Sequence, residues 1–142
     1  MASPDVVRSV NVLVRDPRGR TLLQIRDAST PTYPLLWGFW GGATSPLDAS
    51  PAHCAARELQ EELELDAAPA DFSRAGVRTS SSGEAWLMLY RPAVAWGAFR
   101  VREGAGAGFF WRSELLQLPL SRPVADHLRT DPHLFGEADA TA

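Results

Sequence analysis

The sequence predicts a layered α/β domain, because stretches with strand character alternate along the chain with two longer helical stretches. The strand segments are rich in β-branched and aromatic residues and cover residues 6–15, 21–26, 37–40, 72–79, 84–96 and 109–111. The helical segments, 51–63 and 121–130, each have a serine as N-cap, Ser50 and Ser121, and carry a proline in the first turn. With 142 residues, the chain suffices for one domain over 1–142.

Composition excludes several classes of protein. The net charge of −3 provides no basic surface for a nucleic-acid duplex. The single Cys54 rules out an internal disulfide and a multi-cysteine zinc site. No apolar run approaches the roughly 18–20 residues of a membrane span, and residues 1–10 lack the pattern of a signal peptide, so we expect a cytoplasmic protein. All 14 basic residues are arginine, so any contact to phosphate must come from a guanidinium.

The first half of the chain predicts a hairpin followed by a loop and an aromatic strand. Residues 6–15 and 21–26 flank an Asp-Pro-Arg-Gly turn, and residues 28–36 contain two prolines that predict an irregular loop over a pocket. Strand geometry places Trp37 and Phe39 on one side and Trp40 on the other. Rings in such a run are most often core, although one of them could stack on a base. The Gly-Gly pair that follows permits a sharp turn or a close backbone approach.

The helix over 51–63 separates apolar and acidic residues. Its apolar stripe lies roughly 130° around the helix from its carboxylates, at about 100° per residue; the stripe is Ala52, Ala56, Leu59 and Leu63, and the carboxylates are Glu58, Glu61 and Glu62. Like charges at these spacings repel, and they lie toward the helix end that disfavours anions. Two interpretations follow: a divalent cation held by the carboxylates, or a solvated acidic face with Arg57 bridging to Glu61.

The second half predicts a buried strand, a flexible loop and a terminal helix. Near-continuous hydrophobicity over 84–96 indicates a central strand. Residues 104–108 are rich in glycine but lack the lysine of a phosphate-binding loop, so we expect a flexible loop. His127 and His133 have little support as a metal or catalytic pair, and His53 should face solvent. The C-terminal tail, about 136–142, should fray.

One motif spans residues 42–65. Gly42 is followed after five residues by Asp48 and after eight more by Arg57-Glu58-Leu59-Gln60-Glu61-Glu62. This motif resembles the Nudix box, the signature of the Nudix hydrolases. Asp48 stands where the family has glutamate, one extra residue, most simply Ala49, precedes the helix, and Glu64 replaces a glycine. The flanking segments, Leu22–Arg26, Trp37–Gly42 and Phe109–Leu115, have the order and spacing typical of such proteins.

The resemblance implies a Nudix-like α/β/α sandwich with a central mixed sheet. It implies hydrolysis of a nucleoside diphosphate linked to another moiety, a pyrophosphatase activity that needs Mg²⁺ or Mn²⁺. The implied metal ligands are the side chains of Glu58, Glu61 and Glu62 and the backbone carbonyl near Gly42. The implied catalytic set adds Arg57, which pairs with a carboxylate, and Glu103, which orients water, with Glu84 as an alternative to Glu103. The alternatives are that one of Glu58, Glu61 and Glu62 orients the water and that Glu103 is an exposed charge on a mobile loop.

The resemblance also assigns substrate contacts and leaves alternatives open. The implied contacts to a small-molecule nucleotide are Arg26, Trp37, Phe39, Gly41 and Gly42. A surface charge is an equal interpretation of Arg26. The substrate range extends to nucleoside triphosphates and oxidised guanine nucleotides, and a homodimer is open. The rival functions are a catalytically inactive Nudix-like module that binds a nucleotide or a protein, and an unrelated domain with a solvated acidic helix.

Overall fold

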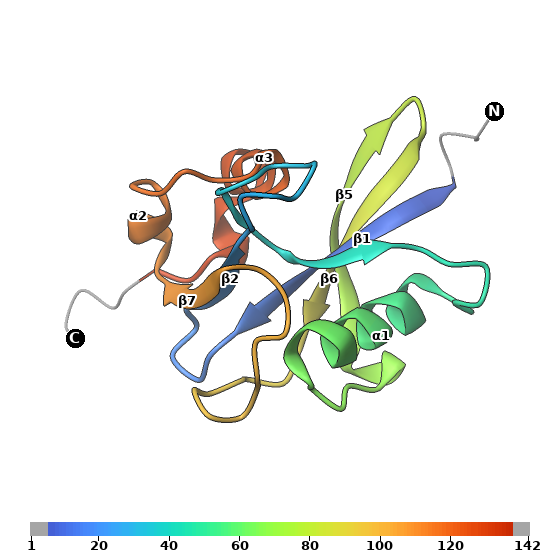
Figure 1. Ribbon diagram of the computed structural model, residues 1–142, viewed down its shortest axis with the longest axis horizontal. Helices are drawn as coiled ribbons and strands as arrows, with labels where there is room; N and C mark the ends of the chain where they lie inside the picture. Colours follow the sequence, from blue (N-terminus) through green and yellow to red (C-terminus); the bar gives the residue numbers. More distant parts are fainter. Residues whose placement is uncertain (1–5, 138–142) are drawn as a thin grey trace.

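Seven strands and three α-helices make up the fold in the computed structural model, which describes residues 6–137. The elements in chain order are β1 (Val7–Arg15), β2 (Thr21–Ile25), β3 (Trp37–Gly38), β4 (Trp40–Ala43), α1 (Pro51–Leu63), the short 3₁₀ turn η1 (Pro69–Asp71), β5 (Phe72–Ser80), β6 (Gly83–Tyr90), β7 (Gly106–Phe110), α2 (Arg112–Leu115), α3 (Arg122–Thr130) and η2 (Pro132–Leu134). Strands and helices alternate as predicted (Figure 1).

Strand β1 lies at the centre of the sheet. It pairs in parallel with β6 and antiparallel with β2 and β4, so the sheet is mixed, as expected. The main strand order is β3-β2-β1-β6-β5, and β7 pairs with β2. Within this register Val10 faces Gly42 and Asn11 faces Gly41. The glycine pair is therefore held against the middle of the central strand.

Two hydrophobic cores cover the two faces of the sheet and define the sandwich. Because side chains alternate along a strand, Val10, Val12 and Val14 of β1 pack into the core beneath α1, whereas Leu13 packs into the core with α3. The helix α1 contributes Leu59 and Leu63 to the first core, and both are fully buried. Figure 1 shows α1 and α3 on opposite sides of the sheet. The predicted apolar stripe of α1 is thus confirmed as its packing face.

Three segments differ from the sequence prediction. The single strand expected over 37–40 is split at Phe39 into β3 and β4. The predicted strand over 84–96 ends at Tyr90, before Pro92, and a long loop follows. Strand β7 begins at Gly106, inside the glycine-rich segment that we expected to be a flexible loop, because residues 106–110 pair along the whole of β2. Tertiary pairing with β2 here outweighs the low strand propensity of glycine.

Helix α1 has the predicted bounds, and hydrogen bonds cap both of its ends. Ser50 caps the N-terminus by accepting a hydrogen bond from the His53 N–H at 3.2 Å. At the C-terminus Glu64 adopts left-handed backbone angles, with φ of 53°, and its N–H donates to the Gln60 carbonyl. Glu64 stands at the position where the sequence lacks the expected glycine, and it adopts the conformation that glycine favours.

The remaining helices and the tail complete the second layer. Helix α3 follows Ser121 as predicted, although the Ser121 side chain makes no capping bond. Of the stretch 136–142 expected to fray, Gly136 and Glu137 both contact Arg112, and residues 138–142 lie outside the described part of the chain. None of the helices within residues 6–137 is long and apolar enough to cross a membrane.

Candidate active site

Two buried glutamates from α1 meet the glycine pair of β4. The side chains of Glu58 and Glu62 lie one helical turn apart, and the residues are only 8% and 1% exposed. The Gly41 N–H donates to both Glu62 carboxylate oxygens, at 3.1 and 3.3 Å. The Glu58 carboxylate lies directly over Gly42, where an added Cβ would come within 2.6 Å of Glu58 Oε1. The absence of a side chain at Gly42 therefore makes room for a carboxylate.

The two carboxyl groups are held in an environment that disfavours their charge. Burial raises the pKa of Glu62 above the ordinary carboxyl range, and the adjacent Glu58 carboxylate and the charge of Glu103 raise it further. Burial also raises the pKa of Glu58, against the lowering effect of Arg57. Arg57 pairs with Glu58 but not with Glu62, so its charge offsets only part of the repulsion, and the pair remains an environment that favours a further cation.

Glu61 does not join this pair. Its side chain is 57% exposed, and its one ion pair is to Arg57 Nη1 at 3.5 Å. Successive helical residues are about 100° apart, so Glu61 lies nearly opposite the apolar stripe whereas Glu62 borders it. In the described residues, 6–137, no group of three or more His, Cys, Asp or Glu side chains is arranged to hold a metal ion. The three carboxylates that the sequence grouped on one face are thus divided in the structure.

Arg57 of α1 binds the loop that precedes the helix. Its guanidinium donates to both carboxylate oxygens of Asp48, at 3.1 and 2.9 Å, and to the Ala43 carbonyl at 3.3 Å. It also pairs with Glu58 at 3.1 Å. The hydrogen bond from Arg57 lowers the pKa of Asp48 to about 2. Asp48 therefore reaches the arginine despite its shorter side chain and the extra residue in the loop.

A cavity of about 420 Å³ opens beside these groups. Its wall includes the predicted residues Arg26, Phe39, Gly41, Gly42, Glu58 and Glu103, together with Ser9, Asn11, Tyr33 and Ser121. Glu103 reaches the cavity from the loop between β6 and β7. The N–H groups of Arg100 and Arg102 anchor this loop by donating to the Leu63 and Glu62 carbonyls at the end of α1, at 2.9 and 2.8 Å. The structure thus places Glu103 near the buried pair, whereas Glu84 lies outside this cavity.

Arg26 holds a loop in place. Its guanidinium donates to the Thr32 carbonyl at 2.8 Å and to the hydroxyls of Thr30 and Thr32 at 3.0 and 3.2 Å. The loop carries two left-handed non-glycine residues, Tyr33 and Leu35, with φ of 51° and 60°. Tyr33 lines the cavity and is a site candidate that the sequence reasoning missed. Its position between two prolines in a loop over the pocket was the available signal.

The aromatic strand divides between the two cores. Trp37 lies outside the cavity, and its ring packs edge-on against Phe110 with centroids 4.9 Å apart. Trp40 is fully buried beneath α1, and its indole N–H donates to the Leu22 carbonyl at 3.0 Å. Phe39 is 6% exposed and forms part of the cavity wall while packing on Phe135. Of the predicted aromatic contacts, only Phe39 therefore reaches the cavity.

The histidines lie outside the cavity, and the cysteine contacts Arg57 without lining the cavity. His53 is exposed and contacts Ser50. His127 is buried in α3, and His133 lies in η2. Cys54 is buried in α1, and burial raises its pKa to about 12, so the thiol is protonated and unreactive at neutral pH. None of these four side chains lines the cavity.

Comparisons with known proteins identify this arrangement of sheet, glycine pair and acidic helix. The family model for the NUDIX domain matches residues 5–113, so the chain belongs to the NUDIX family. It is a Nudix-type pyrophosphohydrolase, an enzyme that acts on phosphoric anhydride bonds. No curated protein matches the sequence.

Solved structures share the fold at low identity. The MutT protein from Methanosarcina mazei Go1 has a TM-score of 0.69 and 21% identity, covering 91% of this chain and 94% of that one. The NUDIX domain of Shewanella oneidensis NrtR, solved with ADP ribose, has a TM-score of 0.68 and 16% identity, covering 89% and 86%. The ORF135 protein of E. coli has a TM-score of 0.60 and 25% identity, covering 89% and 92%.

Proposed function

We propose that this enzyme hydrolyses a nucleoside diphosphate linked to another moiety and that it requires Mg²⁺ or Mn²⁺. The observation that carries the proposal is the buried pair of Glu58 and Glu62 against Gly41 and Gly42. Glu103 reaches the same cavity from a different loop. A carboxylate cluster of this kind suits a hard cation and a polyanionic substrate, and it would be costly in a protein that bound neither.

The donor set fits a divalent ion. Glu58 and Glu62 offer carboxylate oxygens, and Gly42 offers a backbone carbonyl beside them. Glu61 belongs to the proposed ligand set, although its exposed side chain here pairs with Arg57, so metal binding requires that side chain to turn toward the ion. When bound, the ion would neutralise charge on the diphosphate and lower the pKa of a coordinated water.

The chain's own residues position these groups. The Gly41 N–H fixes the Glu62 carboxylate, and the Arg57–Asp48 pair fixes the loop that leads into the helix. In our proposal Glu103 orients the attacking water and accepts its proton at a carboxylate oxygen, because it lines the same cavity as Glu58. Arg57 has its donors committed to Asp48 and Glu58 and acts as a positioning residue.

The cavity wall suggests where the nucleoside binds. Phe39 and Tyr33 provide aromatic surface, and Asn11 and Ser121 provide polar groups next to it. Aromatic faces stack on bases of any sequence, and polar edges select among them. Two structural neighbours bear on the substrate class: NrtR was solved with ADP ribose, and another is a dihydroneopterin triphosphate pyrophosphohydrolase from E. coli. We therefore propose ADP-ribose and nucleoside triphosphates, including oxidised guanine nucleotides, as the substrates to test first.

A substrate panel tests the proposal. Phosphate, pyrophosphate and nucleotide products would be measured with nucleoside triphosphates, ADP-ribose and dinucleoside polyphosphates, with Mg²⁺, with Mn²⁺ and with chelator. We expect turnover of at least one substrate that depends on the metal. Tight nucleotide binding without turnover of any substrate would favour the inactive module instead.

Carboxamide variants test the ligand assignment. Glu62→Gln and Glu61→Gln should each reduce metal-dependent turnover by about 100-fold or more while leaving the fold intact, because the amide keeps the size of the side chain and removes the charge. Asp66→Asn is a matched control, since Asp66 is an exposed carboxylate outside the cavity. Unchanged turnover in Glu62→Gln, with circular dichroism confirming the fold of all three variants, would contradict the assignment.

A further inference from the structure

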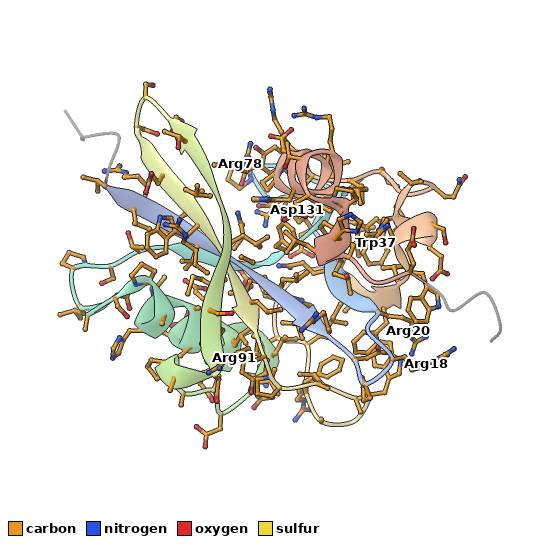
Figure 2. The ribbon with its side chains drawn as sticks, turned by 180° about the vertical axis from the view of Figure 1, so that it is seen from behind. Arg18, Arg20, Trp37, Arg78, Arg91 and Asp131 are labelled. Atoms are coloured by element: carbon orange, nitrogen blue, oxygen red, sulfur yellow. The ribbon has the colours of Figure 1, made fainter. Side chains whose placement is uncertain are left out.

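A second cavity, of about 580 Å³, is larger than the one at the acidic helix. It lies between α3, the hairpin of β5 and β6, and the start of β1. Its wall includes Arg8, Ser9, Arg78, Ser80, Glu84, Arg122, Asp126, His127 and Arg129. Figure 2 shows Arg78 on β5 reaching toward α3. The site described above uses none of these charged groups.

The charge of this cavity is opposite to that of the whole chain. Four arginines line it, against the two carboxylates Asp126 and Glu84, in a protein whose net charge is −3. Asp126 holds Arg78 at 2.8 Å, and its contacts to Arg129 and Arg122 are longer, at 3.5 and 3.9 Å. The Glu84 carboxylate accepts the indole N–H of Trp86 at 3.0 Å. The Asp126 carboxylate is therefore shared among three guanidinium groups.

Arg8, the fourth arginine of this wall, is not paired with a carboxylate of residues 6–137. Within residues 6–137, the Arg8 guanidinium has no carboxylate within 4.0 Å, since the ten ion pairs found there do not include it. The aliphatic part of Arg8 packs over Gly83, which directs the side chain along the hairpin. An arginine cluster with this surplus charge favours a polyanion.

A buried polar atom in the same wall lacks a partner. His127 is 4% exposed and lines the cavity, and its Nε2 forms no hydrogen bond with any group of residues 6–137. A buried polar atom without a partner costs free energy that a bound group can recover. The ring packs over Gly76, where an added Cβ would meet it at 3.1 Å, so its position is fixed by the sheet.

The two cavities adjoin each other. Ser9 of β1 lines both of them. The first turn of α3 separates them, with Ser121 and Pro123 in the wall of the catalytic cavity and Arg122 in the wall of the basic one. The two cavities are therefore neighbours on the same molecule, with Ser9 common to both walls.

We propose that the basic cavity binds a second phosphate group of the substrate, one that lies apart from the anhydride bond that is cleaved. This inference rests on the proposed function and narrows the substrate class to nucleotides that carry an additional phosphate monoester. Arg8, Arg78 and Arg122 are the proposed contacts, because they come from three different elements and converge on one cavity. Guanidinium groups bind a phosphate monoester dianion with paired, charge-assisted hydrogen bonds.

Binding of reaction-product analogues tests this inference without turnover. Calorimetry would compare AMP with adenosine 2′,5′-bisphosphate and adenosine 3′,5′-bisphosphate, which differ from AMP only by one phosphate monoester. We expect at least one bisphosphate to bind about 10- to 100-fold more tightly than AMP. Equal affinity of AMP and both bisphosphates, or no binding of any of the three, would overturn the proposal. Because no hydrolysis is measured, this result is independent of the proposed reaction.

Arginine variants test whether the basic cavity causes the preference for a bisphosphate over AMP. Arg122→Gln and Arg8→Gln should each remove most of the bisphosphate preference and leave AMP affinity within about twofold. Both side chains lie at the surface, so the variants should fold even if Arg78→Gln, which breaks the pair with Asp126, does not. Arg18→Gln is the matched control, an exposed arginine far from Arg78 in Figure 2. An unchanged preference in both Arg8→Gln and Arg122→Gln would also overturn the proposal.

Discussion

At the scale of single residues, the glycine pair of β4 shows two different reasons for lacking a side chain. Gly41 has φ of 120°, and a Cβ there would collide with the backbone of Val10 in the adjacent strand. Gly42 has no such backbone collision, and its added Cβ would instead meet the Glu58 carboxylate. The first glycine is therefore required by the fold, and the second by the position of a site residue.

Because the two glycines are needed for different reasons, Gly41→Ala should mainly lower stability, whereas Gly42→Ala should mainly lower turnover. Gly41→Ala should destabilise the protein by about 2–5 kcal/mol, because a fixed backbone atom cannot move aside and the positive φ adds strain. Gly42→Ala should retain most of the stability but reduce metal-dependent turnover by about tenfold or more, because Glu58 must rotate out of place. Chemical denaturation and steady-state kinetics would measure the two effects. Similar stability losses in both variants would contradict this account.

At the scale of elements, the acidic helix depends on two loops that are distant in sequence. The loop before α1 is tied to it by the Arg57–Asp48 pair. The loop before β7 covers its C-terminal carbonyls through the N–H groups of Arg100 and Arg102. Both arginine side chains also lie within 4 Å of the Glu64 carboxylate, where cations favour the negative end of the helix dipole. These exposed ion pairs are individually weak.

The helix end gives a stability prediction. Glu64→Gly should raise the free energy of unfolding by about 0.5–1 kcal/mol, because glycine adopts the left-handed conformation without the strain that glutamate bears, partly offset by the entropy of the unfolded chain. The melting temperature should rise by about 2–4 °C. Glu64→Gln separates charge from conformation, since it removes the ion pairs and keeps the strain. If Glu64→Gln stabilised the protein as much as Glu64→Gly, repulsion within the helix and not backbone strain would be the cause.

At the scale of the whole molecule, the mixed sheet brings together groups that are far apart in the chain. Strand β1 carries Ser9 between both cavities, with the acidic site of α1 on one side and the basic wall of α3 and the hairpin on the other (Figure 1). The protein thus separates a negatively charged site, suited to a metal ion, from a positively charged cavity, suited to phosphate. Figure 2 shows the same molecule from behind.

The buried glutamates make global stability depend on pH. The unfolded chain ionises Glu62 above its ordinary pKa of 4.5, whereas the native metal-free protein keeps the proton to higher pH. The unfolded state therefore binds fewer protons, and the free energy of unfolding should fall as pH rises above 4.5, by at most about 1.4 kcal/mol per pH unit for this group. Thermal melts with chelator from pH 5 to about pH 8 would measure this slope.

A bound divalent metal ion should reverse this fall in stability with rising pH. A cation binds the ionised carboxylates, so the stabilisation by Mg²⁺ or Mn²⁺ should grow with pH. Glu62→Gln should flatten the slope in chelator and lose most of the stabilisation by metal, whereas Asp66→Asn should behave like the natural protein. A slope in Glu62→Gln equal to that of the natural protein would exclude Glu62 as its source.

Local sequence patterns were sufficient for the helix and for the residue types of the site. Ser50, Pro51 and the spacing of Leu59 and Leu63 determine where α1 begins and which face it buries, because these signals act within a few turns of the chain. The presence of a Nudix box, with its arginine and three glutamates, follows from the sequence in the same way. Family membership could therefore be predicted before any coordinates were known.

Only the tertiary structure decided how these residues are used. It turned Glu62 toward Gly41 and left Glu61 in solvent, committed the guanidinium of Arg26 to its own loop, and brought Glu103 to the cavity. It also assembled the basic cavity from β1, β5 and α3. The physical reason is that side-chain periodicity is local, whereas the pairing of β1 with β4 and β6 joins residues 28 to 77 positions apart. No local pattern contains that long-range pairing.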